Sequence, residues 1–297
     1  MTSDTERHRH VPSRLPHSDE GPALAARLLA APGEPALELI EAEPDGSAGG
    51  APLLFVHGAF AGAWCWAEHA LPFFGRRGRR AAAVSLRGHG GSDGRDRLRR
   101  SGLDDMLRDV RRAVEAMPEP PVVIGHSLGG YLAQLLIGSA RMRALVLVGS
   151  LPPDGMALVG PRLAMTETRI WSEALAATLA NSRAAIDLAG LEILFGEGVP
   201  REEALRYGAR LIPESPRALA EAHLPRPVLP AFLAGLPTLV LNGAADRLVW
   251  PATAFRTALY HGAGHRLFEA GGHFLMLDPC AEAVARHILE WLARRDL

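Results

Sequence analysis

One serine stands between two glycines where an apolar run passes into a helical pattern, in Gly125-His126-Ser127-Leu128-Gly129. This is the G-x-S-x-G pattern, in which a sharp turn from strand to helix holds the serine in a strained backbone conformation. Glycine is expected at both flanks because a Cβ there would collide with the neighbouring strand or helix. A serine hydroxyl is a poor nucleophile unless a base and an orienting group stand behind it. A serine that only caps the helix is the alternative, but the strand before Ser127 and the helix after it favour a nucleophile.

Short apolar runs alternate with segments of helical periodicity along most of the chain. Apolar runs within 51–58, 120–127 and 142–150 predict strands that are buried on both faces. Apolar residues at helical spacing predict a helix over 103–117. Strands that alternate with helices imply βαβ units and a doubly wound, mostly parallel sheet, so the predicted fold class is α/β.

Two stretches break this alternation. Residues 1–35 are polar at first and rich in His, Arg and Pro, and we expect a disordered N-terminal leader there. Residues 152–236 are rich in Ala, Leu and Arg, and they lie between two predicted core strands. Since a structureless loop of that length is improbable, the stretch predicts a helical cap over Ser127. The core is then formed by 36–151 and 237–297.

The serine motif, with its strand and its helix, resembles the α/β-hydrolase family from about residue 36 to the C-terminus. That family orders its catalytic triad as nucleophile, acid and histidine. The resemblance implies that Asp246, in N-G-A-A-D-R after a strand, is the acid and that His273, after the last strand, is the base. Asp154 is the competing acid, because some members carry the acid after the preceding strand. Asp278 is expected to cap the last helix.

Acyl transfer also needs two preorganised donors for the oxyanion. The resemblance implies that these are the backbone N–H groups of Leu128, directly after the nucleophile, and of Ala59 in the loop VHGAFAGAWCW. Phe60 is the neighbouring alternative to Ala59. His57 is expected to shape this loop rather than to act as a second base.

Substrate-binding candidates lie close to these groups. Aromatic residues after the loop either line an acyl or alcohol pocket or pack beneath the loop. The candidates are Phe60, Trp64, Trp66 and His126. Further candidates in the predicted cap, for which helix packing is an equal explanation, are Trp171, Phe195 and Tyr207.

The composition excludes several classes of protein. The chain has 297 residues, 48% of them hydrophobic, and a formal net charge of −1, so no global field attracts nucleic acid or an anionic membrane. Cys65 and Cys280 are too few for a disulfide framework, which favours a cytoplasmic location. No apolar run approaches a membrane span, and no secretory signal is visible. We expect no metal and no cofactor, and the oligomeric state is left open.

Together these features predict a serine hydrolase that cleaves a carboxylic ester, lactone or thioester of a small hydrophobic substrate through an acyl-enzyme. Relatives that dehalogenate or open epoxides use aspartate as nucleophile, so Ser127 disfavours those reactions. The loop VHGAFAGAWCW resembles those of methyl-ester esterases and of hydroxynitrile lyases. A non-hydrolytic lyase or a C–C bond hydrolase on the same triad is therefore the first alternative. A ligand-binding receptor of the same fold with slow turnover is the second.

Overall fold

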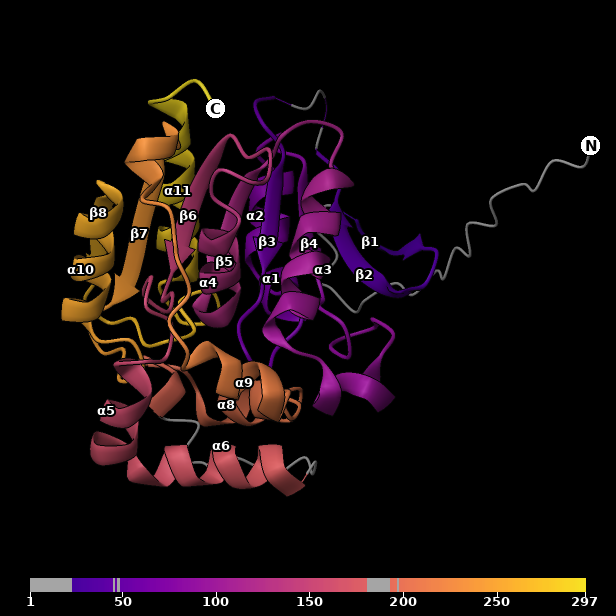
Figure 1. The fold of residues 1–297 in the computed structure, drawn as a ribbon. Coiled ribbons are helices and arrows are strands. Elements are labelled where there is room, and N and C mark those ends of the chain that lie inside the picture. The colour runs from indigo at the N-terminus through magenta and orange to yellow at the C-terminus, as the bar shows by residue number, and fades with distance from the viewer. Residues whose placement is uncertain (1–22, 45, 47–48, 181–192, 197) are drawn as a thin grey trace, which may run out of the picture.

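The computed structural model describes residues 23–44, 46, 49–180, 193–196 and 198–297. Its centre is one eight-stranded sheet in the order β1-β2-β4-β3-β5-β6-β7-β8 (Figure 1). The strands are β1 (Leu24–Ala31), β2 (Glu34–Ala42), β3 (Leu53–Val56), β4 (Ala81–Val84), β5 (Val122–His126), β6 (Ala144–Val148), β7 (Thr238–Gly243) and β8 (Gly264–Phe268). Strand β2 pairs antiparallel with β1 and β4, and the pairs from β4 through β3 to β8 are parallel.

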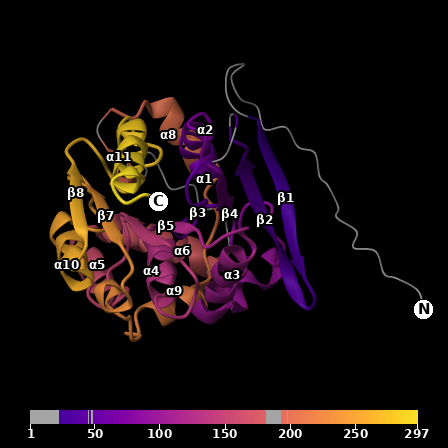
Figure 2. The same ribbon diagram turned by 90° about the horizontal axis from the view of Figure 1, so that it is seen from above.

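The connections between parallel strands are mostly helical, as the alternation in the sequence predicts. The helices of the core are α1 (Trp64–Ala67), α2 (Ala70–Gly75), α3 (Leu103–Glu115), α4 (Ser127–Leu135), α10 (Pro251–His261) and α11 (Ala281–Ala293), with a 3-10 helix η1 (Arg95–Arg100). Figure 2 shows α1, α2 and α11 on one face of the sheet and α3, α4 and α10 on the other. The predicted α/β fold class is confirmed.

Both faces of the central strands are buried, which explains their continuous apolar runs. In β3, Leu53 and Phe55 belong to the hydrophobic cluster that includes α1, α2 and α11. Their neighbours Leu54 and Val56 belong to the cluster on the opposite face. Successive side chains of a strand point to opposite faces, so each strand contributes to both halves of the core.

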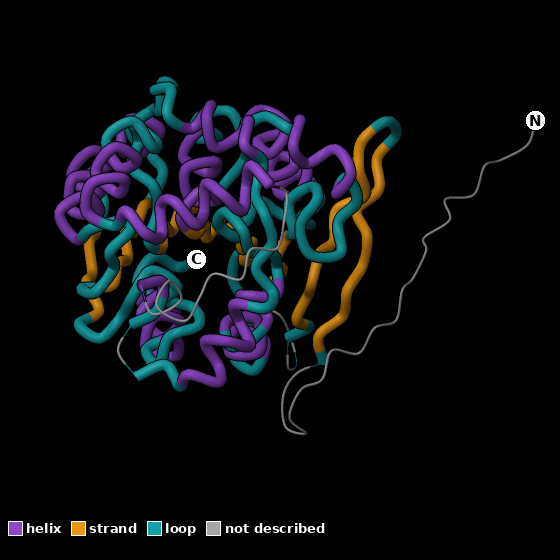
Figure 3. Tube along the Cα trace, turned by 90° about the horizontal axis from the view of Figure 1, so that it is seen from below, coloured by secondary structure: helices purple, strands orange, loops and turns teal. Residues whose placement is uncertain are grey.

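The folded part of the chain begins earlier than the sequence predicts. Strand β1 lies within residues 1–35, which the sequence analysis assigned to a disordered leader, so that assignment is wrong for residues 24–35. β1 is an edge strand whose side chains are half-buried or exposed, and it therefore lacks the alternation that marks a strand. Its pairing with β2, including a two-bond contact of Arg27 with Glu41, forms the long hairpin seen at the sheet edge in Figure 3. Residues 1–22 lie outside the described residues.

The long insertion, residues 152–236, leaves the sheet after β6 and returns before β7, its parallel neighbour. It contains α5 (Val159–Thr166), α6 (Thr168–Ala180), α8 (Arg201–Gly208), α9 (Pro216–Ala222) and the 3-10 helix η2 (Ala231–Ala234). Helices α5, α6, α8 and α9 gather at the end of the sheet toward which the arrow of β7 points (Figure 1). The 3-10 helix η2 instead lies at the start of β7, where the Ala231 N–H donates to His261 at the end of α10. The stretch 181–192, whose apolar residues helped to predict a helical insertion, lies outside the described residues. Among the described helices, none is long and apolar enough to cross a membrane.

Candidate active site

Ser127 occupies the corner between β5 and α4. Its φ is +49°, a left-handed value that is rare for a residue with a side chain. Both flanking glycines are required by close approach. A Cβ at Gly125 would lie 2.6 Å from the Gly130 Cα, and one at Gly129 would lie 2.2 Å from the His57 carbonyl oxygen. The sharp turn therefore exposes Ser127 at the N-terminus of a helix, as the motif predicts.

His273 and Asp246 lie together beside this corner. The His273 ring is almost fully buried, and its Nδ1 lies 3.0 Å from Asp246 Oδ2. The other carboxylate oxygen of Asp246 accepts the N–H groups of Leu248 at 2.9 Å and of Val249 at 2.8 Å. Three donors thus fix this carboxylate. With the proton of His273 on Nδ1, its Nε2 is left as an acceptor.

The two competing aspartates have other roles. Asp154 accepts Arg256 Nη2 at 3.0 Å in an exposed ion pair. Asp278 does not cap the last helix, as expected from the sequence, because α11 begins only after Cys280. Its carboxylate instead accepts the N–H of Gly272 at 2.6 Å and of Gly196 at 3.0 Å. Burial raises the pKa of Asp278 to about 6, and its contacts tie the loop before His273 to the insertion.

The loop after β3 packs directly against Ser127. A Cβ at Gly58 would lie 2.8 Å from Ser127 Cβ, which shows how closely the two segments approach. His57 Nδ1 donates to Gly58 O at 2.7 Å, while its Nε2 accepts the Leu86 N–H at 2.9 Å. Burial, together with the nearby His89, lowers the pKa of His57 to about 3, so this ring is neutral. His57 therefore has the structural role that the sequence predicts.

The orientation of the peptide units in this loop distinguishes Ala59 from Phe60 as the candidate oxyanion donor. Because a trans peptide points its N–H opposite to its C=O, the bond from His57 to Gly58 O directs the Ala59 N–H away from His57. The Phe60 N–H is already engaged, since it donates to Glu214 Oε2 at 3.3 Å. Of the two candidates for the oxyanion donor, Ala59 is favoured. Leu128 lies in the first turn of α4, where N–H groups have no partner within the helix.

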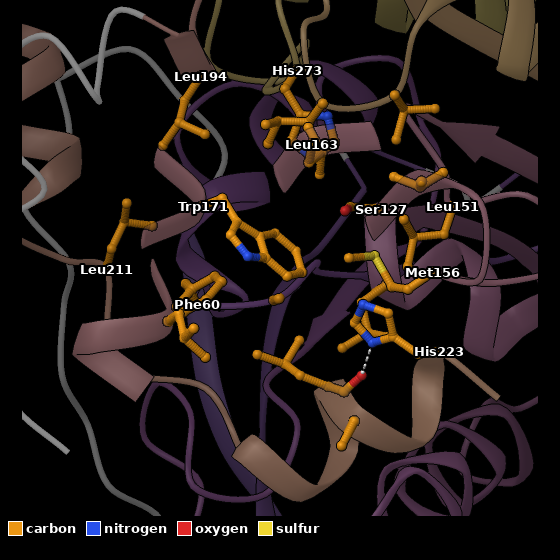
Figure 4. A pocket seen from close by; sticks show the side chains of 18 of the residues that line it. Phe60, Ser127, Leu151, Met156, Leu163, Trp171, Leu194, Leu211, His223 and His273 are labelled. Carbon is orange, nitrogen blue, oxygen red and sulfur yellow. Dashed lines mark hydrogen bonds between the residues drawn. The ribbon is translucent and has the colours of Figure 1, made fainter. Parts of the chain in front are cut away.

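A cavity of about 600 Å³ opens above Ser127. In Figure 4 the side chains of Ser127, His273, Met156 and Trp171 converge on this space. The polar side chains in its lining are Ser127, His273, His223 and the indole of Trp171, and the rest of the lining is hydrocarbon or thioether. His223 donates from Nδ1 to Leu219 O at 2.8 Å. A cavity of this size and composition suits a small apolar ligand with few polar groups.

Only some of the predicted pocket residues line the cavity. Phe60 and Trp171 do, together with Leu194 and Leu211. The expectation that Trp64, Trp66 and His126 line it is wrong, and Phe195 and Tyr207 are also absent from its wall. Their actual environments are packing contacts: Trp66 against Phe55, Trp64 against Tyr207, Phe195 against Tyr207 and Phe274, and His126 against His273 and Phe274.

The His126 ring holds the backbone of His273, the candidate base, by a hydrogen bond. Its Nε2 donates to the backbone oxygen of His273 at 3.0 Å. Complete burial, reinforced by the neighbouring His273, lowers the pKa of His126 well below its ordinary value, so the ring is neutral. His126 thus acts on the backbone of His273 rather than on a ligand.

Sequence reasoning missed two residues of this site. Gly149 follows β6 with a φ of +50°, and a Cβ there would come within 3.4 Å of both Asp246 Oδ2 and His273 Nδ1. Glu214 lies in the insertion, and its contact with Phe60 has no signal in the local sequence. A glycine at the end of a buried strand could have drawn attention to Gly149. In the described part of the chain, no group of three or more His, Cys, Asp or Glu could hold a metal ion.

The sheet order, the serine corner and the His–Asp pair after the last strands define the class of an α/β hydrolase. In agreement, residues 53–286 match the model of the alpha/beta hydrolase family. The chain belongs to this family.

Curated relatives match over a short stretch. Protein phosphatase methylesterase 1 of Bos taurus is 39% identical over 85 residues, which are 27% of this chain and 22% of the bovine protein. The Mus musculus protein is 38% identical over 85 residues. The matched stretch is thus about a fifth of the length of these relatives.

Solved structures match over nearly the whole chain. An esterase from Exiguobacterium antarcticum superimposes with a TM-score of 0.71 at 19% identity and covers 90% of this chain and 98% of its own. A thermophilic esterase from Thermogutta terrifontis has a TM-score of 0.66 at 21% identity and covers 92% and 99%. At this level of identity the likeness concerns the fold, and esterases and hydrolases share it.

Proposed function

We propose that this protein is a carboxylic ester hydrolase in which Ser127 is the nucleophile, His273 the general base and Asp246 the acid. The observation that carries the proposal is the pair of His273 Nδ1 and Asp246 Oδ2 at 3.0 Å, in which His273 lines the same cavity as the strained Ser127. A hydrolytic role is shared by the family. The match to a methylesterase, although short, supports an ester as the bond that is cleaved.

In the proposed reaction, His273 Nε2 takes the proton of Ser127 as its oxygen attacks the substrate carbonyl. The N–H groups of Ala59 and Leu128 stabilise the oxyanion. His273 then protonates the leaving alcohol, and it activates the water that hydrolyses the acyl-enzyme. Asp246 holds the proton of His273 on Nδ1 and stabilises the imidazolium that forms.

The insertion acts in this proposal as a cap that selects the substrate. Apolar residues of α5 and α6 face Ser127 across the cavity, among them Leu163 and Trp171. Two charged contacts join Arg247, next to Asp246, to Glu167 at 2.8 and 2.6 Å. A small ester with an apolar acyl or alcohol part fits this lining better than a charged one, since a charged group would lose its hydration there.

The test combines a fluorophosphonate probe with a series of p-nitrophenyl esters of increasing acyl length. The wild-type protein is expected to be labelled and to hydrolyse esters. Ser127→Ala should lose labelling and lower turnover by about 10³-fold or more, because the triad acts as a unit. Ser139→Ala is the matched control, since that hydroxyl bonds to Leu136 O away from the cavity. Labelling that persists in Ser127→Ala contradicts the nucleophile. Labelling without cleavage of any ester, thioester or lactone favours a lyase or a binding role.

A further inference from the structure

Glu214 is a carboxylate of the insertion that is buried against the core. It is 2% exposed, and it lies just before α9. Its Oε1 accepts the N–H of Ser215 at 2.7 Å, and its Oε2 accepts the N–H of Phe60 at 3.3 Å. A buried carboxylate is costly unless its charge is matched and its oxygens are bonded. The charge of Glu214 therefore requires a buried cationic partner.

The partner is His89, which comes from the loop after β4 and is fully buried. Its Nε2 lies 3.1 Å from Glu214 Oε2, in a contact that is ionic rather than a well-aligned hydrogen bond. Because His89 Nδ1 donates to Arg87 O at 3.0 Å, a proton on Nε2 makes the ring an imidazolium. Burial alone would lower the pKa of His89, but the Glu214 carboxylate and the bond to Arg87 O together outweigh burial and raise it. His89 likewise holds the pKa of Glu214 below its ordinary value against the effect of burial.

This ion pair adjoins the most strained part of the loop after β3. Phe60 has a φ of +66°, which costs free energy for a residue with a side chain. The insertion holds both polar groups of its backbone: Glu214 accepts from the N–H, and the Ile212 N–H donates to the C=O at 2.8 Å. His57 fixes the preceding peptide unit through Gly58 O. Consecutive peptide planes around Ala59 are thus fixed by the core on one side and by the insertion on the other.

We propose that Glu214 is a positioning residue for the oxyanion hole, which holds the strained Phe60 so that the Ala59 N–H faces the reacting carbonyl. The inference rests on the proposed ester hydrolysis and adds a role for the insertion in the chemical step. The insertion then does more than select the substrate. The Ala59 N–H, which belongs to the core, points at the substrate carbonyl only while residues 212–214 are in place.

The substitution Glu214→Gln tests this arrangement with almost no change in volume. An amide cannot satisfy all three neighbours. If its NH₂ group replaces Oε2, two donors face each other at the Phe60 N–H, and if it replaces Oε1, the same conflict arises at the Ser215 N–H. Loss of a whole oxyanion donor costs about 10²–10³-fold in kcat. A misplaced donor should therefore lower kcat by about tenfold or more, while KM for a p-nitrophenyl ester changes by less than about threefold.

Glu221→Gln is the matched control. Glu221 is also a carboxylate of the insertion that accepts a backbone N–H of the core, that of Leu103 at 2.7 Å, but this contact lies away from Ser127. Its variant should keep kcat within about twofold of wild type. Circular dichroism and thermal unfolding establish that both variants are folded. If Glu214→Gln does not fold, Ile212→Pro is used, because it removes the N–H that holds the Phe60 carbonyl while leaving Glu214 unchanged, and it should lower kcat in the same way.

The outcomes separate this inference from the proposed function. A folded Glu214→Gln protein with wild-type kcat overturns the positioning role, and so does one in which only KM rises. The same conclusion follows if Ile212→Pro must be used and leaves kcat unchanged. A wild-type protein that neither hydrolyses esters nor reacts with a fluorophosphonate overturns the proposed function, and the role of Glu214 falls with it. A slower kcat in Glu214→Gln together with normal kinetics in Glu221→Gln supports the role.

Discussion

Acid destabilisation of the fold follows from the burial of His57. Its ring is fully buried in the loop that packs against Ser127, and both nitrogens are engaged, one as a donor to Gly58 O and the other as an acceptor from Leu86. A second proton would break the bond from Leu86 and place a charge beside His89. The folded protein therefore excludes a proton that the unfolded chain binds readily.

The magnitude can be worked from the two pKa values of His57, about 3 in the folded protein and 6.5 in the unfolded chain. Between these values the unfolded state binds more protons, so the free energy of unfolding falls as the pH falls. At pH 5 the solution lies about 1.5 units below the unfolded pKa, and each unit corresponds to about 1.4 kcal/mol. From pH 7 to pH 5, His57 alone should remove about 2 kcal/mol of stability.

The assay compares wild type with His57→Gln by guanidinium unfolding at pH 7, 6 and 5, followed by tryptophan fluorescence. Glutamine keeps an acceptor for the Leu86 N–H but does not titrate. The variant is less stable at pH 7, yet its loss of stability between pH 7 and 5 should be about 2 kcal/mol smaller than that of wild type. Equal losses in the two proteins, at equal m-values, would show that His57 takes up a proton in the folded state and would contradict the predicted effect of its burial.

Two further predictions concern catalysis. Asp246→Asn should lower kcat for ester hydrolysis by up to about 10⁴-fold, because the amide favours the wrong tautomer of His273, whereas Asp154→Asn should stay within about twofold of wild type. Steady-state kinetics decide this, and a larger effect at Asp154 would move the acid to the earlier strand. Trp171→Ala enlarges the cavity across from Ser127, so it should shift the preferred acyl length upward while p-nitrophenyl acetate is still cleaved. An unchanged preference for acyl length would show that the Trp171 side chain does not limit the space for the acyl group.

Much of the core could be predicted from the sequence because each feature has a local cause. The central strands are buried on both faces and therefore leave continuous apolar runs, such as the one that ends at Val56. The serine corner is specified within a few residues, from Gly125 to Gly129. The fold class and the family are confirmed, and the structure brings Asp246 and His273 together. The catalytic roles of these residues remain predictions, as does the cytoplasmic location.

The errors have a common physical origin in contacts that a residue's own short stretch of sequence does not contain. Strand β1 is specified by its pairing with β2 rather than by its own pattern. Trp64 and Trp66 are close in sequence to the loop after β3, but their rings pack into the core and not into the cavity. Asp278 bonds to Gly196, far away in the chain. The contacts of Trp64 with Tyr207 and of Asp278 with Gly196 depend on how the insertion lies on the sheet, which no local window of residues contains.

The placement of the insertion between β6 and β7 has a consequence for the order of folding. These strands are neighbours in the sheet, yet the whole insertion separates them in the chain. The corner of Ser127 is formed by consecutive elements, β5 and α4, whereas Asp246 and His273 follow β7 and β8. Closing a long connection costs chain entropy before the contacts it allows are made, so such pairings form slowly. A chain still emerging from the ribosome would therefore form the corner of Ser127 first, and the proposed triad would be complete only when the last strands have joined the sheet.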